Sequence, residues 1–449
     1  MAKLRFLGAA SSVTGSCFLL IPDTGPHLLI DIGMFQGVAE TTRLNEEELN
    51  LDIAKLGGVI ITHAHLDHVG RLPYLVKLGY HGPIYMTEPT QVISEITLLD
   101  SAKISREDES KLPLYDEADV IKTMTQIETV NYHQQFQVGQ FKINLLDAGH
   151  ILGSASVEII DTKTKQKLIF SGDLGNSPED IVKPTEIPEF ADIAVMESTY
   201  GDRTHASENA NLVLKEEINA IEQNDGVLLI PAFSVERAQE LLHKIDHLKQ
   251  NKEVKDDTMV FLDSPMAIKT TRIYKQFKNL YGDEITKHAT NDDPFDFPGL
   301  KMVEKHKESL NIDKIQGAKV IIAGSGMMSG GRILHHAIKF LPDGKNRLLL
   351  VGFQAEKTLG REINQGARDV KIEGRHVEIH AHIRKSSGMS AHADQPKLLD
   401  WVKSIKGIKT VYLIHGENIA RQALKPLIQD RAQIDNIILP NLYEEFDLG

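Results

Sequence analysis

Short apolar runs separated by polar turns dominate the first 200 residues. The runs are rich in β-branched residues and have the length of strands rather than helices. We expect strands at 4–10, 17–22, 27–33, 57–62, 83–87, 141–147, 156–161, 167–173 and 192–198. A polar stretch at 88–127 has a helical pattern instead, and Pro113 interrupts it. This strand-rich region favours stacked sheets covered by helices.

The pattern changes near residue 205, where apolar runs begin to alternate with helical runs. The apolar runs lie at 226–233, 258–265, 319–331 and 346–353. Near-continuous apolar strands between helices are typical of a parallel, doubly wound sheet, which takes ligands at the carboxyl ends of its strands. After about residue 385 a mixed pattern returns, with a further strand at 410–417. The pattern thus changes near residues 205 and 385.

Composition narrows the class of protein without identifying it. A chain of 449 residues suggests two or three domains, and 41% apolar with 25% charged residues is ordinary for a globular protein. The net charge of -13 argues against a globally basic nucleic-acid binder, but not against a local basic channel. The single cysteine, Cys17, excludes internal disulfides and fits a reducing compartment. No apolar run approaches the roughly 20 residues of a membrane span, so we expect a cytoplasmic protein without a membrane partner.

The strongest chemical signal follows the predicted strand at 57–62. There His63, His65, Asp67 and His68 place four metal-capable side chains within six residues. Imidazole and carboxylate suit Zn²⁺, and also Mn²⁺ or Fe²⁺. His63 and His65 alternate and would project to one side, while the adjacent Asp67 and His68 can diverge. One loop could therefore serve two metals; the alternative is a polar surface loop.

Further acidic and histidine side chains stand at or near the ends of other predicted strands. Each alone is more often a cap or a hydrogen-bond partner, but their recurrence at one structural position is informative. They are Asp31, His150, Asp173, Glu197, His392 and His415.

The order of these motifs resembles one family. The HAHLDH run at 63–68, followed by His150 and Asp173, is the pattern of the metallo-β-lactamase superfamily. Glu197 in ESTYGDR, His392 in SAHAD and His415 in LIHGE are similar to the β-CASP nucleases, which include ribonuclease J and the endonuclease subunit of the cleavage and polyadenylation specificity factor. The resemblance implies an α/β fold: an αββα sandwich with an inserted, doubly wound β-CASP domain. We expect the sandwich at 1–204 and 386–449 and the insertion at 205–385.

The resemblance also implies roles for the residues. One metal would take His63, His65 and His150, the other Asp67, His68 and His415, with Asp173 bridging two Zn²⁺ ions, or Mn²⁺. The implied catalytic residues are His392, Glu197, Asp67 and Asp31. His392 would face the scissile phosphate and pair with Glu197. Asp31 would orient a ligand, or only cap its strand.

Contacts with RNA phosphates are expected in the inserted domain. The glycine-rich GSGMMSGG segment and the helix after it supply the candidates, although a tight turn and ordinary packing or solvation are the alternatives. The candidates are Ser325, Ser329, Arg332 and His336.

The leading hypothesis is a zinc-dependent ribonuclease that hydrolyses phosphodiester bonds with a hydroxide activated by two metals. By resemblance, the substrate is single-stranded RNA cut endonucleolytically in the cleft between the domains. Histidine rather than valine at 415 favours RNA over DNA. The alternatives are a thioester or lactam hydrolase, a DNA nuclease, and a non-catalytic RNA-binding subunit. The cutting mode, sequence preference, native metal and oligomeric state stay open, and a homodimer is allowed for.

Overall fold

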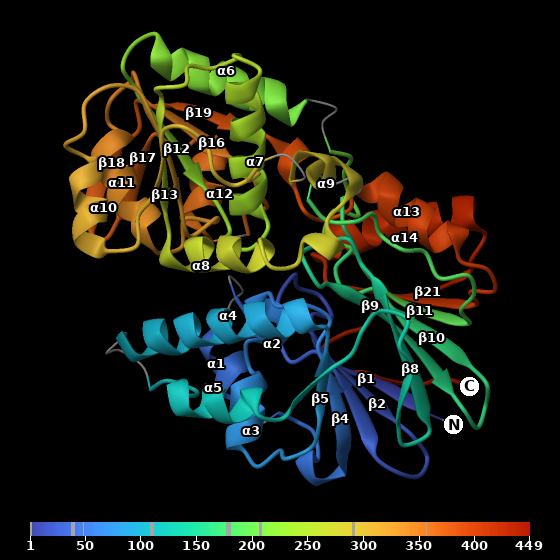
Figure 1. Ribbon diagram of the computed structural model, residues 1–449. Coiled ribbons are helices and arrows are strands. Elements are labelled where there is room, and N and C mark those ends of the chain that lie inside the picture. The colour runs from blue at the N-terminus through green and yellow to red at the C-terminus, as the bar shows by residue number, and fades with distance from the viewer. Residues whose placement is uncertain are drawn as a thin grey trace. The chain divides into compact units, whose positions relative to one another are not determined.

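The chain folds into two compact units in the computed structural model (Figure 1). One unit is formed by Met1–Thr204 with His392–Gly449, the other by His205–Ala391. The structure describes residues 2–36, 41–47, 49–107, 112–176, 181–205, 209–289, 292–355 and 357–449. None of the described helices combines the length and the apolar character that a membrane crossing needs.

The first unit contains two seven-stranded sheets. In order across the sheet, the first consists of β22 (Glu445–Asp447), β1 (Lys3–Gly8), β2 (Cys17–Ile21), β3 (His27–Ile30), β4 (Leu56–Ile60), β5 (Ile84–Met86) and β6 (Ile127–Thr129). The second consists of β21 (Asn436–Ile438), β20 (Thr410–Ile414), β11 (Ile193–Glu197), β10 (Lys167–Phe170), β9 (Ala155–Asp161), β8 (Phe141–Asp147) and β7 (Phe136–Val138).

A shared apolar core holds the two sheets face to face. Phe18 of the first sheet lies 6.1 Å from Phe170 of the second, between ring centroids, and Phe6 lies 5.3 Å from Tyr412. Burial of such aromatic side chains is a main source of stabilisation in sheet packing. One core cluster contains inward-facing residues of both sheets.

Helices cover the outer faces of both sheets, which completes an αββα sandwich. The first sheet packs against residues of four helices, which are α2 (Leu66–Val69), α3 (Leu72–Lys77), α4 (Glu88–Glu107) and α5 (Glu117–Met124). The second packs against α13 (Gln395–Ser404) and α14 (Asn418–Ala432). The short helices α1 (Thr41–Glu46) and η1 (Ile53–Lys55) also belong to this unit. The predicted sandwich is confirmed.

The second unit is built on a parallel six-stranded sheet. Its order is β14 (Leu300–Met302), β13 (Met259–Asp263), β15 (Lys319–Ala323), β12 (Val227–Pro231), β16 (Arg347–Leu350) and β19 (His382–Lys385). Successive residues Leu228 and Leu229 point to opposite faces and are both fully buried, so both faces are covered. This is the doubly wound arrangement that the sequence predicts.

The helices of the second unit alternate with these strands. They are α6 (Ala210–Glu222), α7 (Arg237–Gln250), α8 (Pro265–Tyr274), η2 (Lys278–Leu280), α9 (Asp283–Ala289), α10 (His306–Ile312), α11 (Arg332–Phe340), α12 (Leu359–Asn364) and η3 (Ser387–Met389). A separate hairpin is formed by β17 (Asp369–Ile372) and β18 (Arg375–Glu378).

Several strands end earlier than the apolar pattern predicts. β3 ends at Ile30 and β10 at Phe170, so Asp31 and Asp173 lie in loops just past the strands. The strands β6, β7 and β22, of three residues each, were not predicted. The helical stretch at 88–127 consists of α4 and α5, with Pro113 between them.

A candidate metal centre at the strand ends of the first unit

The candidate side chains of the first unit meet at one edge of the sandwich. β3 pairs parallel with β4, and β10 and β20 pair parallel with β11, so their carboxyl ends lie at the same side of their sheets. The loop after β4 carries His63 and His65 and runs into α2, which carries Asp67 and His68. Topology thus gathers residues that are far apart in the sequence.

The first group comprises His63, His65, His150 and one oxygen of Asp173. The Nδ1 atom of His65 lies 3.1 Å from Nε2 of His63 and 3.2 Å from Nε2 of His150. The Oδ2 atom of Asp173 lies 3.5 Å from Nε2 of His63 and 3.7 Å from Nε2 of His150. The four side chains can surround a single ion.

The second group comprises Asp67, His68 and His415. The Nε2 atom of His415 lies 3.3 Å from Nε2 of His68 and 3.3 Å from Oδ2 of Asp67. His415 has a φ of 47° and its backbone N–H donates to Ala9, which fixes the ring at the end of β20. These three residues can also surround an ion.

Asp173 lies between the two groups and faces both of them. Its Oδ2 faces the first group, whereas its Oδ1 lies 3.3 Å from Nε2 of His68 and 3.6 Å from Nδ1 of His415. Oδ1 is buried and accepts no hydrogen bond from the residues that the structure describes. A buried carboxylate oxygen without a donor is costly unless a cation compensates it.

The donor set fits divalent metal ions. Imidazole nitrogens bound tetrahedrally at about 2.0–2.1 Å from a zinc ion lie roughly 3.3 Å apart. The nitrogen pairs here are separated by 3.1–3.3 Å. Each neutral imidazole has one N–H, so three nitrogens converging on one point cannot all be satisfied by hydrogen bonds among themselves. A cation is therefore favoured at the first group, which has three imidazoles, and the 3.3 Å between the Nε2 atoms of His68 and His415 fits a metal ion at the second.

The electrostatics of the groups also favour metal binding. Burial, together with the neighbouring His68, lowers the pKa of His63 well below its usual value, and burial lowers the pKa of His65 to about 4. Both rings are neutral at pH 7, the form that binds a metal. Burial alone would lower the pKa of His68, but Asp173 and Asp31 raise it well above its usual value. The carboxylates of Asp173 and Asp31 thus favour a positive charge at His68.

Asp31 and Thr62 hold two of the rings in place. Asp31 accepts hydrogen bonds from the Thr62 backbone N–H at 2.8 Å, from the Thr62 hydroxyl at 2.9 Å and from Nδ1 of His68 at 2.8 Å. Because the hydroxyl donates to Asp31, it accepts from Nδ1 of His63, 3.1 Å away. Nδ1 of both rings is thus engaged outside the centre, which leaves Nε2 of each facing the centre as the atom that a metal ion would bind. Sequence reasoning missed Thr62, because a threonine after a strand has no distinctive signal.

His392 and Glu197 form a pair at the side of the centre. The Nδ1 atom of His392 lies 3.2 Å from Oε1 of Glu197, which also accepts from the Leu174 backbone N–H at 2.7 Å. Burial alone would lower the pKa of His392, but Glu197 and then Asp173 raise it to about 9. His392 and Asp67 keep 18% and 19% of their side-chain surface exposed, so a solvent-borne ligand can reach them.

The four candidate phosphate contacts lie in the second unit. Ser325 and Ser329 bond to each other, with 3.2 Å between their hydroxyl oxygens, and Ser329 is exposed. Arg332 instead donates to the Asp263 carboxylate at 2.6 Å and to two backbone carbonyls. His336 is fully buried and bonds Asp263 at 2.7 Å. Arg332 and His336 are therefore both bonded to Asp263 within the unit, and the structure does not support a phosphate contact by either.

Comparisons with known proteins agree with this arrangement. Residues 12–199 match the metallo-beta-lactamase superfamily, residues 238–363 the Beta-Casp domain, and residues 376–440 the Zn-dependent metallo-hydrolase RNA specificity domain. The chain is 37% identical to Ribonuclease TTHA0252 of Thermus thermophilus, covering 95% of this chain and 96% of that protein. It is 32% identical to an RNase J-like protein of Methanocaldococcus jannaschii, over 93% of each chain. It is 28% identical to Endoribonuclease ysh1 of Schizosaccharomyces pombe, covering 95% of this chain and 55% of that protein.

Proposed function

Since the chain belongs to the β-CASP branch of the metallo-β-lactamase superfamily, we propose that it is a zinc-dependent endoribonuclease acting on single-stranded RNA. The relatives with full-length similarity are named as a ribonuclease and an RNase J-like protein, and a longer one as an endoribonuclease. The observation that carries the proposal is Asp173, whose two oxygens face two separate groups of metal-capable side chains. A carboxylate shared by two groups can hold two metal ions close together, as in the two-metal sites of enzymes that hydrolyse phosphodiesters.

The residues that would hold the metals are those of the two groups. His63, His65 and His150 would bind one zinc ion, Asp67, His68 and His415 the other, and Asp173 both. When bound, the two ions would acidify water and neutralise the charge of the phosphate. The buried Asp31 and Thr62 keep the rings of His63 and His68 in the tautomer that this binding needs.

His392 is the proposed proton donor of the reaction. With a pKa of about 9 its ring is doubly protonated at pH 7, and Nδ1–H donates to Glu197. The second N–H, at Nε2, would donate to a phosphate oxygen or to the leaving oxygen of the ribose. Stabilising charge at this point and supplying a proton each lower the barrier to phosphodiester cleavage. Glu197 acts by holding His392 in place and in its charged form.

Closed circular, single-stranded RNA provides the sharpest test of this function. A circle has no 5′ end, so its conversion to a linear product demonstrates endonucleolytic cutting. We expect the purified protein to linearise the circle, chelator to abolish the reaction, and added Zn²⁺ to restore it. His63→Ala should be inactive. The matched control is His133→Ala, since His133 lies in the same unit but is exposed and pairs with Glu186.

Three results would overturn the proposal. One is cutting that survives chelator and His63→Ala. Another is cutting of linear but not circular RNA, which would indicate an exonuclease. The third is turnover of a thioester without RNA cleavage, which would restore the small-molecule hydrolase as the better hypothesis. Zn²⁺ as the native metal, with Mn²⁺ as the alternative, and a cytoplasmic location stay predictions from the sequence, which also allows for a homodimer.

A further inference from the structure

A second histidine cluster lies in the other unit, apart from the candidate metal centre. His243 and His247 belong to α7 and His288 to α9, and one side-chain nitrogen of each lies within 4.8 Å of those of the other two. The cluster lies inside the unit: His243 is buried, and the side chain of His288 is 7% exposed. Three imidazoles in contact, of which His243 is buried and the other two are half-buried, need a chemical explanation.

The geometry of the cluster matches a metal site. His243 and His247 are four residues apart, so they share one face of α7, and their Nε2 atoms are 3.1 Å apart. The ring of His288 completes a triangle, with centroids 5.2 Å from His243 and 4.7 Å from His247. Two nitrogens bound to one zinc ion are separated by roughly this distance, about 3.3 Å.

One nitrogen of the third ring has no hydrogen-bond partner. The Nδ1 atom of His288 is buried and forms no hydrogen bond with the residues that the structure describes. Its Nε2 lies 3.1 Å from Oδ2 of Asp246 and 3.0 Å from Nε2 of Gln250, whose amide also donates to the Asp246 carboxylate. When Asp246 accepts from Nε2–H, the lone pair of His288 is left on Nδ1, an arrangement common for metal-bound histidines.

Several carboxylates lie near the cluster. Asp246 belongs to α7 like the histidine pair, and the charges of Asp292, Asp293 and Asp296 act on it. A cation between the three imidazoles would compensate part of this negative charge.

We propose that His243, His247 and His288 bind a third metal ion, with Asp246 as the carboxylate that orients His288. Imidazole ligands favour Zn²⁺ or a similar first-row ion over Mg²⁺ or Ca²⁺. The ion ties α7 to α9 and has a structural role in the second unit. The site is independent of the proposed ribonuclease activity, because none of its ligands belongs to the candidate metal centre.

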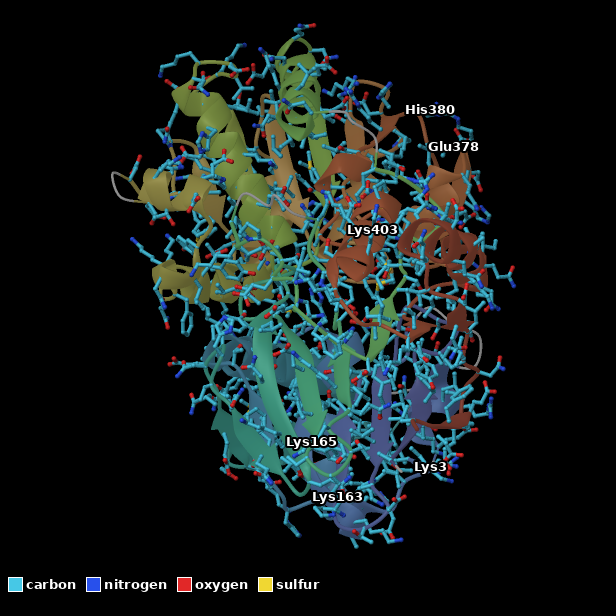
Figure 2. All side chains as sticks on the ribbon, turned by 90° about the vertical axis from the view of Figure 1, so that its right-hand side faces the viewer. Lys3, Lys163, Lys165, Glu378, His380 and Lys403 are labelled. Atoms are coloured by element: carbon cyan, nitrogen blue, oxygen red, sulfur yellow. The ribbon has the colours of Figure 1, made fainter. Side chains whose placement is uncertain are left out.

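Metal content measured by mass spectrometry tests the site on the full-length protein. The protein is stripped with chelator, reloaded with Zn²⁺ and desalted. We expect His247→Asn and His288→Asn each to lose one equivalent of zinc per chain relative to the wild type. The matched control, His380→Asn, should lose none, since His380 lies at the surface of the same unit and pairs with Glu378 at 3.2 Å (Figure 2). A difference of one equivalent does not depend on how many ions the other unit binds.

Equal zinc content in the wild type and in folded variants would overturn the proposal. Circular dichroism establishes folding, and the two substitutions lie on different helices, so one can decide if the other fails. Should neither variant fold, the zinc-loaded wild type decides through anomalous X-ray scattering at the zinc edge. A peak between His243, His247 and His288 supports the site, and no peak there in a crystal with zinc at the candidate metal centre contradicts it.

Discussion

Two buried aspartates, one in each unit, lie at or just past the carboxyl end of a strand but have opposite surroundings. Asp173 follows β10, and its Oδ1 accepts no hydrogen bond from any described residue. Asp263 ends β13 and accepts from the Ser309 hydroxyl at 2.5 Å, from Arg332 at 2.6 Å and from His336 at 2.7 Å. One carboxylate lies among ring nitrogens of two candidate metal-binding groups, the other among N–H and O–H donors that bond to it.

The difference separates a binding site from an internal ion network. The donors of Asp263 lower its pKa although burial raises it, so its charge is compensated within the protein. Asp173 instead faces the imidazoles of both groups, which a metal ion would bind together with it. A strand-end aspartate therefore indicates a metal site only where no hydrogen-bond donors of the protein reach its carboxylate. Four substitutions can break or sharpen this comparison.

The largest effect is expected from Asp173→Asn. Removing the charge shared by both groups should weaken metal binding and lower kcat for RNA cleavage by about 10³-fold or more, since metal ions supply several kcal/mol of transition-state stabilisation. Zinc content and single-turnover cleavage measure the two effects. Stability should fall little, because the amide removes an uncompensated buried charge. A variant with full zinc content and normal kcat would contradict the central role of Asp173.

Asp263→Asn is the reciprocal test in the second unit. It leaves Arg332 and His336 without their carboxylate, so we expect the unfolding free energy to fall by about 3–5 kcal/mol. Denaturant unfolding measures the loss. Zinc content should not change, and cleavage at a temperature where the variant is folded should stay close to the wild-type rate. Loss of zinc with stability intact would mean that Asp263 belongs to a metal site after all.

Glu197→Gln should alter the pH dependence of cleavage. A proton donor must be protonated, so the rate falls as pH rises through the pKa of His392. Glu197 raises that pKa, and its removal should therefore move the alkaline limb of the kcat profile to lower pH and reduce the rate at pH 7 several-fold. Glu197→Asp should restore part of the shift. An alkaline limb that does not move would rule out His392 as the group responsible.

The smallest effect is expected from Thr62→Val. The substitution removes the hydroxyl that accepts from His63 while leaving Asp31 bonded to His68. Metal affinity should fall by about 10-fold, as for other residues that orient metal ligands, and chelator competition measures it. The control is Thr123→Val, which removes another buried hydroxyl of the first unit, bonded at 2.8 Å to the Asp119 carbonyl. Equal metal affinities in the two variants would show that Thr62 does not support the metal centre.

The sequence predicts the fold and the members of the centre better than their supporting contacts. Apolar periodicity identifies the longer strands, and the strand-end positions of His63, Asp173 and His415 indicate that they could converge. The roles of Arg332 and His336 could not be predicted. They depend on Asp263, which lies about 70 residues earlier, and an arginine after a glycine-rich turn looks the same whether it binds phosphate or an internal carboxylate.

The histidine cluster of the second unit shows the same limit. The four-residue spacing of His243 and His247 was a readable signal on a predicted helix. The third member, His288, lies about 40 residues later on another helix, and only the fold brings it close. Local spacing reveals part of a site, whereas long-range packing completes it.

The most direct measurement of the central claim is the position of zinc in crystals of the zinc-loaded protein, by anomalous scattering at the zinc edge. Asp173 bridging two metals predicts two peaks about 3.5–4 Å apart, one beside His63, His65 and His150 and one beside Asp67, His68 and His415. A single peak at this centre, or two peaks there with Asp173 bound to neither ion, would contradict the claim.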